Sequence, residues 1–146
     1  MGSAVKYPDY LSYRVRRVYL LMAQRIEDAL KGQGIGRSQY QVLSRVARAG
    51  TLGQKDLQHT MQVEPATLTG IVDVLVAKGW LERSENADDK RCRTLQLTET
   101  GLALLDRVPD PYEIVEKRML TGLSAGTRAH VESALEIMIL NLEDRS

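Results

Sequence analysis

Aromatic residues and cysteine are scarce in this chain of 146 residues, which has no Phe, one Trp (Trp80) and six Tyr. Proteins that bind single-stranded nucleic acid or RNA loops stack the bases on aromatic side chains, so the composition disfavours that class of ligand. The single cysteine, Cys92, excludes an intrachain disulfide. No Cys and His pattern has the spacing of a zinc site, and we expect no metal.

The chain also lacks an excess of charge of one sign and any long apolar run. Its formal net charge is +1, which disfavours a uniformly basic protein that coats DNA. Any DNA contact would have to come from locally clustered charge. No apolar run approaches the roughly 20 residues of a membrane helix, and the N-terminal segment lacks the apolar core of a signal peptide. We expect a cytoplasmic protein with no membrane partner.

A catalytic constellation is missing as well. The two histidines, His59 and His130, lie in different expected helices and have no paired acid or nucleophile at a useful spacing. We therefore predict that the chain is not an enzyme and that it uses no cofactor.

Apolar residues recur every three or four positions along most of the chain, which is typical of helices that bury one face. Pro65 suits a first helical position, Gly79 follows a last turn, and Pro109 with Pro111 interrupts a helix. The pattern predicts helices over residues 10–31, 37–49, 54–61, 65–78, 99–108, 112–120 and 125–142.

The spacing also predicts which faces of these helices are buried. We expect Tyr40, Leu43, Val46 and Ala47 to be buried in the helix over 37–49, and Leu68, Ile71, Val72, Leu75 and Val76 in the helix over 65–78. The last helix carries apolar residues on more than one side, which predicts a partner surface beyond its own chain.

The segment between Leu81 and Thr98 predicts the fold class. Two short runs of β type, 81–85 and 93–97, flank a polar loop, and Thr98 is a good N-cap for the next helix. A short helix, a tight turn, a longer helix and a β-hairpin with a basic tip form the layout of a winged helix-turn-helix. We predict a mainly α fold with a small β-hairpin wing.

On these residues the chain resembles the MarR (multiple antibiotic resistance regulator) family of bacterial and archaeal transcription factors. The resemblance covers LSYRVRRV, SQYQVLSRVARAG, VEPATLTGIVDVLVAKGWLER, the wing DDKR and LTETGLALL, and so nearly the whole chain. It implies a homodimer with intertwined N- and C-terminal helices. The implied parts are a dimerisation helix in 1–34, a winged helix-turn-helix DNA-binding domain in 35–98 and dimerisation helices in 99–146.

The resemblance also implies a function. Each subunit of such a dimer presents its winged helix to one half of a palindromic operator in double-stranded DNA. The usual role is repression, released by a small aromatic, phenolic or acyl thioester effector or by oxidation of a cysteine. We expect a cytoplasmic protein of a bacterium or archaeon, associated with the nucleoid when it is bound.

The residues expected to contact DNA fall into three groups. Pro65, Thr67, Thr69 and Gly70 begin the fourth helix, Ser38 and Lys55 lie at the starts of the second and third, and Asp89, Lys90, Arg91 and Arg93 lie in the wing. Hydroxyls near a helix N-terminus can meet phosphates or base edges. Arg91 matches the wing arginine that enters the minor groove in the family, and Asp89 matches an acid that steadies it.

The same residues also allow interpretations in which they do not contact DNA. The family often has arginines at the positions of Gly70 and Val74, and both are missing here. Between Glu82 and Arg93, four acids balance four bases. Exposed helix surface and a solvated hairpin tip are therefore alternatives, as is an antirepressor-like protein-interaction module with little DNA affinity.

In the family the effector binds where the first, second and fifth helices meet. The candidates here are Tyr13, Arg16, Arg17, Leu20, Tyr40 and Tyr112. Tyrosine and arginine beside an apolar cleft suit an aromatic carboxylate, a phenol or an acyl thioester. The alternative is that the tyrosines are core residues and the arginines pair with acids across the dimer.

Cys92 allows a further alternative, a regulator that senses oxidation. Reactive cysteines often lie beside cations, and Arg91 is next to Cys92 in the sequence. No second cysteine in the chain could resolve a sulfenate, so we expect Cys92 to be incidental.

Overall fold

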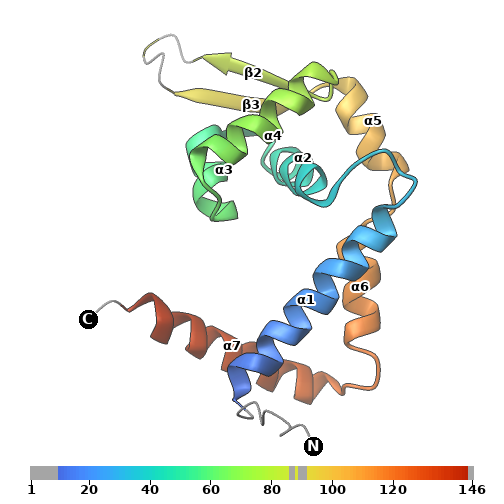
Figure 1. The fold of residues 1–146 in the computed structure, drawn as a ribbon, viewed down its shortest axis with the longest axis vertical. Coiled ribbons are helices and arrows are strands. Elements are labelled where there is room, and N and C mark those ends of the chain that lie inside the picture. The colour runs from blue at the N-terminus through green and yellow to red at the C-terminus, as the bar shows by residue number, and fades with distance from the viewer. Residues whose placement is uncertain (1–9, 86–87, 89–91, 145–146) are drawn as a thin grey trace, which may run out of the picture. The chain divides into compact units, whose positions relative to one another are not determined.

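A computed structural model describes residues 10–85, 88 and 92–144 of the chain (Figure 1). Contacts divide the chain into two compact units, Met1–Pro111 and Tyr112–Ser146. The first unit contains a small β-sheet and the helices packed around it, and the second contains the C-terminal helices.

Helices make up most of both units. They are α1 (Leu11–Leu30), α2 (Arg37–Ala49), α3 (Gln54–Met61), α4 (Pro65–Ala77), α5 (Glu99–Arg107), α6 (Pro111–Met119) and α7 (Ala125–Glu143). Each predicted helix is confirmed to within one residue at either end. The predicted interruption at Pro109 and Pro111 is confirmed too, since α5 ends before it and α6 begins at Pro111.

The sheet is antiparallel, with β1 (Thr51–Gly53), β2 (Leu81–Glu85) and β3 (Arg93–Leu97) in the order β1-β3-β2. The predicted hairpin is confirmed, and its register runs from Leu81 opposite Leu97 to Glu85 opposite Arg93. The sequence did not predict β1. This three-residue strand has no pattern of its own and exists through its pairing with the distant β3, where Thr51 lies opposite Gln96.

The core of the first unit lies between α2, α3, α4 and the sheet. Its fully buried side chains are Val42, Leu43, Val46, Leu57, Leu68, Val72, Leu75, Leu81 and Leu95. Burial of each such aliphatic side chain contributes roughly 1.5–3 kcal/mol to folding. The contacts of α2 with α4, α5 and β3 make it the central helix of this core.

Part of the predicted burial is wrong. Val76 is exposed and Ile71 and Ala47 are only half-buried, whereas Val42, which the prediction omitted, is fully buried. In the last turn of α4 Leu75 is fully buried and the adjacent Val76 is exposed, so the buried stripe of this helix is narrower than the sequence predicted.

The base of the wing is joined to α5 through Thr98. As predicted, Thr98 caps α5: its side-chain oxygen accepts a hydrogen bond from the Gly101 backbone N–H at 3.0 Å. The same hydroxyl donates to the Gly79 carbonyl at 2.6 Å, and the Thr98 N–H donates to the Trp80 carbonyl at 3.2 Å. The residues just before β2 and just after β3 are therefore held together.

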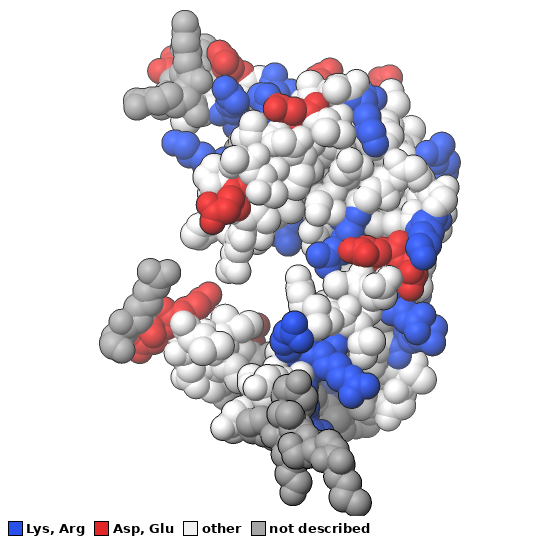
Figure 2. Space-filling model, in the orientation of Figure 1, with Lys and Arg blue, Asp and Glu red and all other residues white. Residues whose placement is uncertain are grey.

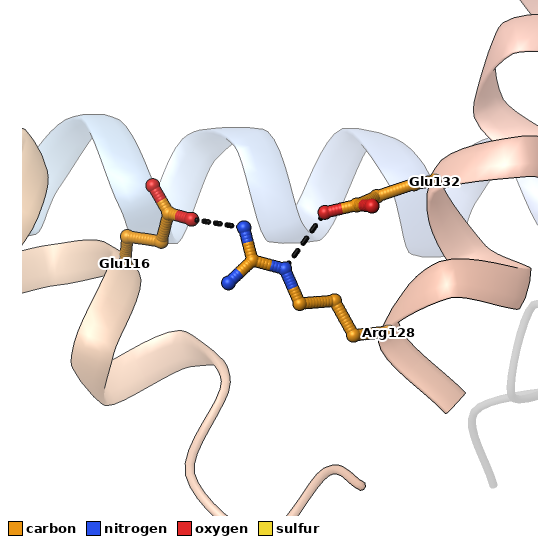
Figure 3. A network of polar contacts seen from close by, with 3 residues as sticks. All are labelled: Glu116, Arg128 and Glu132. Atoms are coloured by element: carbon orange, nitrogen blue, oxygen red, sulfur yellow. Dashed lines mark hydrogen bonds and ion pairs between the residues drawn. The ribbon is translucent and has the colours of Figure 1, made fainter. Parts of the chain in front are cut away.

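In the second unit, α6 and α7 are tied together by a charged network (Figure 3). Arg128 of α7 donates to Glu116 of α6 at 2.9 Å and to Glu132, one turn along α7, at 2.7 Å. The hydrogen bond and charge of Glu132, with a smaller contribution from Glu116, raise the pKa of Arg128. Because these groups are exposed, the network orients the two helices more than it stabilises them.

We predict that Gly101→Ala destabilises the fold. A Cβ at this position would overlap the backbone carbonyl of Trp80, and backbone cannot move as a flexible side chain does. Overpacking of this kind costs about 1–3 kcal/mol, to be measured by chemical denaturation.

Gly70→Ala is the matched control, because it is also a helical glycine but has nothing within 4 Å of the added Cβ. Alanine is the better helix former by up to about 1 kcal/mol, so this variant should be as stable as the wild type or more so. Equal stability of the two variants would contradict the prediction.

Candidate nucleic-acid interface

A groove lies where α3, the start of α4 and β3 meet, on the side of the first unit from which the β2–β3 hairpin projects (Figure 1). Its volume is about 380 Å³, and it is lined by Gln54, Lys55, Gln58, Pro65, Leu68, Thr69 and Arg93. We call it the α3–α4–β3 groove. Four of its residues, Lys55, Pro65, Thr69 and Arg93, are among those that the sequence predicted to contact DNA.

The hydroxyl of Thr69 is held within this groove by Gln54. The Gln54 side-chain amide donates a hydrogen bond to Thr69 Oγ1 at 3.3 Å, and both residues are half-buried. Because that oxygen accepts from Gln54, its own O–H hydrogen is left to donate to another acceptor. A phosphate oxygen, or an acceptor atom on a base edge, meets that requirement.

Sequence reasoning missed Gln54 and Gln58. Both are on α3 and face the groove, but glutamine near the start of a helix is common on any protein surface. No local signal distinguishes them. Only the packing of α3 against β1 and β3, with the hydrogen bond from Gln54 to Thr69 of α4, brings them to the groove.

The remaining residues predicted at the helix starts lie elsewhere on the first unit. Thr67 and Gly70 are exposed on α4 outside the groove lining. Ser38 lines a separate cavity of about 540 Å³ between the end of α1, the start of α2 and Ile71 of α4. Arg37, beside Ser38, lies 4.0 Å from Glu27 across that cavity.

Asp73, on α4, forms an ion pair with Arg83 of β2. The Arg83 Nη2 donates to the Asp73 carboxylate at 2.6 Å, and the arginine side chain is the more buried partner. Sequence reasoning did not single out Arg83. Alternation along β2 places it on the same face as the buried Leu81, which indicates an inward-facing cation that needs an acid.

The wing tip carries the strongest sequence prediction, but Asp89, Lys90 and Arg91 lie outside the residues that the structure describes. Their predicted roles stay predictions. Arg93 is described: it opens β3, is exposed, and lies directly opposite Glu85 in the sheet register.

Cations and anions share the face of the molecule that is drawn in Figure 2. Figure 2 shows Lys and Arg interspersed with Asp and Glu on the face drawn, without one large basic field. This distribution agrees with the formal net charge of +1. An interface with DNA must therefore depend on a few placed cations, among which Lys55 and Arg93 share one groove.

The predicted effector residues are dispersed among different environments. Tyr13, Arg16, Arg17 and Leu20 are exposed on α1, where Tyr13 stacks on Tyr10 with ring centroids 5.9 Å apart. Tyr40 is buried in α2, and Tyr112 is half-buried in the second unit. A shared pocket for these six residues stays a prediction.

Other kinds of site find little support in the described residues. Cys92 is exposed. Over residues 10–85, 88 and 92–144, no group of three or more His, Cys, Asp or Glu side chains is placed to hold a metal ion. No helix in that part of the chain has both the length and the apolarity that crossing a bilayer requires.

The arrangement defines a class of protein. A short helix (α3), a tight turn and a second helix (α4) precede a β-hairpin, and the groove between them gathers cations, amides and a hydroxyl. This is a winged helix-turn-helix, in which α4 takes the position of the recognition helix.

Comparison with known proteins shows what the chain is similar to. Residues 35–93 match the model of the MarR family. The chain is 27% identical over 125 residues to the multiple antibiotic resistance protein MarR of Salmonella typhimurium, covering 83% of this chain and 87% of that protein. It is 25% identical over 122 residues to the HTH-type transcriptional regulator PecS of Dickeya dadantii, covering 82% and 74%.

Solved structures agree. A mutant MarR from E. coli in complex with operator DNA superposes with a TM-score of 0.79 at 26% identity, covering 88% of this chain and 92% of that one. The S. aureus MepR–DNA complex superposes with a TM-score of 0.82 at 22% identity, a likeness of fold. Residues 35–93 therefore form a MarR-type domain, and over most of its length the chain is similar to winged-helix transcriptional regulators of that family.

Proposed function

We propose that this regulator binds double-stranded DNA through the α3–α4–β3 groove and the wing. The observation that carries the proposal is the groove itself, where Lys55, Arg93 and the Thr69 hydroxyl converge from α3, β3 and α4. Cations and hydroxyls at this spacing suit phosphate oxygens, and α4 has the position from which a recognition helix enters a major groove. The similar E. coli protein was solved in complex with operator DNA, which supports duplex DNA as the ligand.

The contribution of Arg91 belongs to the same proposal. With Lys90 and Arg93 it makes the outgoing arm of the wing locally basic. An arginine in a narrow minor groove responds to groove width and electrostatic potential, and so complements a recognition helix that has no arginine.

We propose further that the protein acts as a homodimer on a palindromic operator. The apolar side chains of α7 support this, because none of its residues is buried and Val131, Leu135, Ile137, Ile139, Leu140 and Leu142 are all exposed. The exposed apolar residues of α1, among them Val15 and Val18, would share the same burial. Apolar surface of this extent favours association with a second copy.

The regulatory output that we propose is repression released by a small molecule. Tyr13, Arg16, Arg17, Leu20, Tyr40 and Tyr112 are the candidate contacts for an aromatic carboxylate, a phenol or an acyl thioester. Because α1 and the second unit carry most of them, a ligand there would act through the dimer.

We expect Lys55→Ala, Arg93→Ala and Arg91→Ala each to weaken binding to duplex DNA without unfolding the protein. Each lost phosphate contact should make the negative slope of log K against log salt shallower by about 0.9. The affinities are to be measured by fluorescence anisotropy between low and moderate salt. Arg118→Ala, which removes a cation from α6 outside the winged helix, is the control.

Unchanged affinity and slope in all three variants would remove the groove and the wing from the mechanism. A wild-type chain that bound no duplex at any salt concentration would favour the alternative, an antirepressor-like interaction module.

The dimer predicts that charge placed on α7 disrupts association. Ile137→Glu should move the protein from dimer toward monomer in sedimentation experiments, because burying an unpaired carboxylate at the interface is costly. Glu136→Gln, next to it on the helix, is the control. A wild-type chain that stayed monomeric at micromolar concentration would contradict the proposal.

Exposure of Cys92 keeps a redox role testable. If release of DNA follows ligand binding alone, peroxide should change the affinity of the wild type and of Cys92→Ser equally. A loss of affinity confined to the oxidised wild type would assign the sensing to Cys92.

If no aromatic acid or phenol releases DNA in a ligand screen, the proposed effector class is wrong.

A further inference from the structure

We propose that Arg83 is a positioning residue for DNA binding: it neutralises the Asp73 carboxylate on the recognition helix, which would otherwise repel the phosphates. The inference rests on the proposed function, since it concerns how α4 approaches DNA. It assigns to Arg83 a role through Asp73 rather than a contact of its own with the ligand.

The composition of α4 makes Asp73 unusual. Among the 13 residues of this helix, Pro65–Ala77, there is no Lys or Arg, and Asp73 is the single ionisable side chain. Without a partner, the helix that would enter the major groove carries a net negative charge. DNA has one negative charge for about every 1.7 Å of its axis, so this charge would oppose binding at close range.

Asp73 lies on the side of α4 that would face the DNA. It lies four residues after Thr69, and residues four apart share one face of a helix. Thr69 lines the α3–α4–β3 groove, and Asp73 itself is largely exposed. The carboxylate is thus one turn along from the groove, on the face that continues its surface.

The geometry of Arg83 fits neutralisation rather than direct contact. Its Nη2 lies 2.6 Å from the Asp73 carboxylate, a short charge-assisted hydrogen bond. The arginine side chain is 22% exposed against 56% for the acid, so the carboxylate is the more accessible partner. Among the residues that the structure describes, its Nε is buried and has no hydrogen-bond partner.

The contact also joins the two parts of the winged helix. Arg83 belongs to β2, which packs against α4 and pairs with β3, the strand that carries Arg93. The cation that neutralises Asp73 therefore belongs to β2 of the wing, and the recognition helix itself needs no Lys or Arg.

The test measures the affinity of the full chain for a duplex that the wild type selects from a random-sequence pool. The variants are Arg83→Ala, Asp73→Asn and the double variant, each with its thermal stability. We expect Arg83→Ala to weaken binding at least tenfold at low salt, and Asp73→Asn to bind within threefold of the wild type or more tightly. The double variant should return to within threefold, with an unchanged salt slope.

Lys117→Ala with Glu113→Gln is the matched control, since these residues form an exposed ion pair of the same 2.6 Å length in α6. Neither single change there should alter affinity. If Arg83→Ala does not fold, Arg83→Gln replaces it, because glutamine keeps a donor without the charge, and the same recovery on adding Asp73→Asn is expected.

Three results would overturn the inference. The first is a double variant as weak as Arg83→Ala with a reduced salt slope, which makes Arg83 a phosphate contact. The second is an Arg83→Ala variant that binds like the wild type. The third is a loss of affinity that follows the loss of thermal stability in every variant, which makes the pair purely structural. If the wild type selects no duplex, the proposed function is wrong, and so is the inference that rests on it.

Discussion

The packing of α2 is the constraint on which the rest of the winged helix depends. Val42, Leu43 and Val46 are completely buried, and α2 contacts α4, α5 and β3 at once. Because a protein interior is as densely packed as an organic crystal, these three contacts leave α4 little freedom relative to the sheet. The distances across the α3–α4–β3 groove, and between Asp73 and Arg83, are therefore set by aliphatic residues that make no polar contact themselves.

The charged residues around that core come from the elements next to the recognition helix. The recognition helix has no cation, and the basic residues that would meet DNA come from its neighbours: Lys55 from α3, Arg93 from β3 and the wing arginine Arg91. The one acid on the helix is matched by Arg83 from β2. A chain with a net charge of +1 can bind a polyanion in this way, provided that tertiary contacts keep the few cations on one surface.

Much of the architecture could be predicted because its signals are local. Pro65 and Thr98 satisfy the requirements of a helix start, and Gly79 those of a helix end, within a few residues of themselves. Burial was predicted less well: Val76 is exposed although its neighbour Leu75 is fully buried, because helical period alone cannot indicate how wide a face of the helix its neighbours cover. Of the groove residues, Lys55, Pro65, Thr69 and Arg93 were predicted, from their places at helix starts and in the basic arm of the wing. Gln54 and Arg83 were not predicted.

Local chemistry in the sequence determined the order of the helices, the hairpin and the cations available for DNA. Tertiary structure alone decided the presence of β1, the shape of the groove, the hydrogen bond from Gln54 to Thr69 and the pairing of Asp73 with Arg83. The physical reason is the distance along the chain between the residues that interact. A cap or a turn is satisfied by neighbours in the chain, but a strand as short as Thr51–Gly53, or an acid on a helix, acquires its partner only when folding brings distant residues within a hydrogen bond's length.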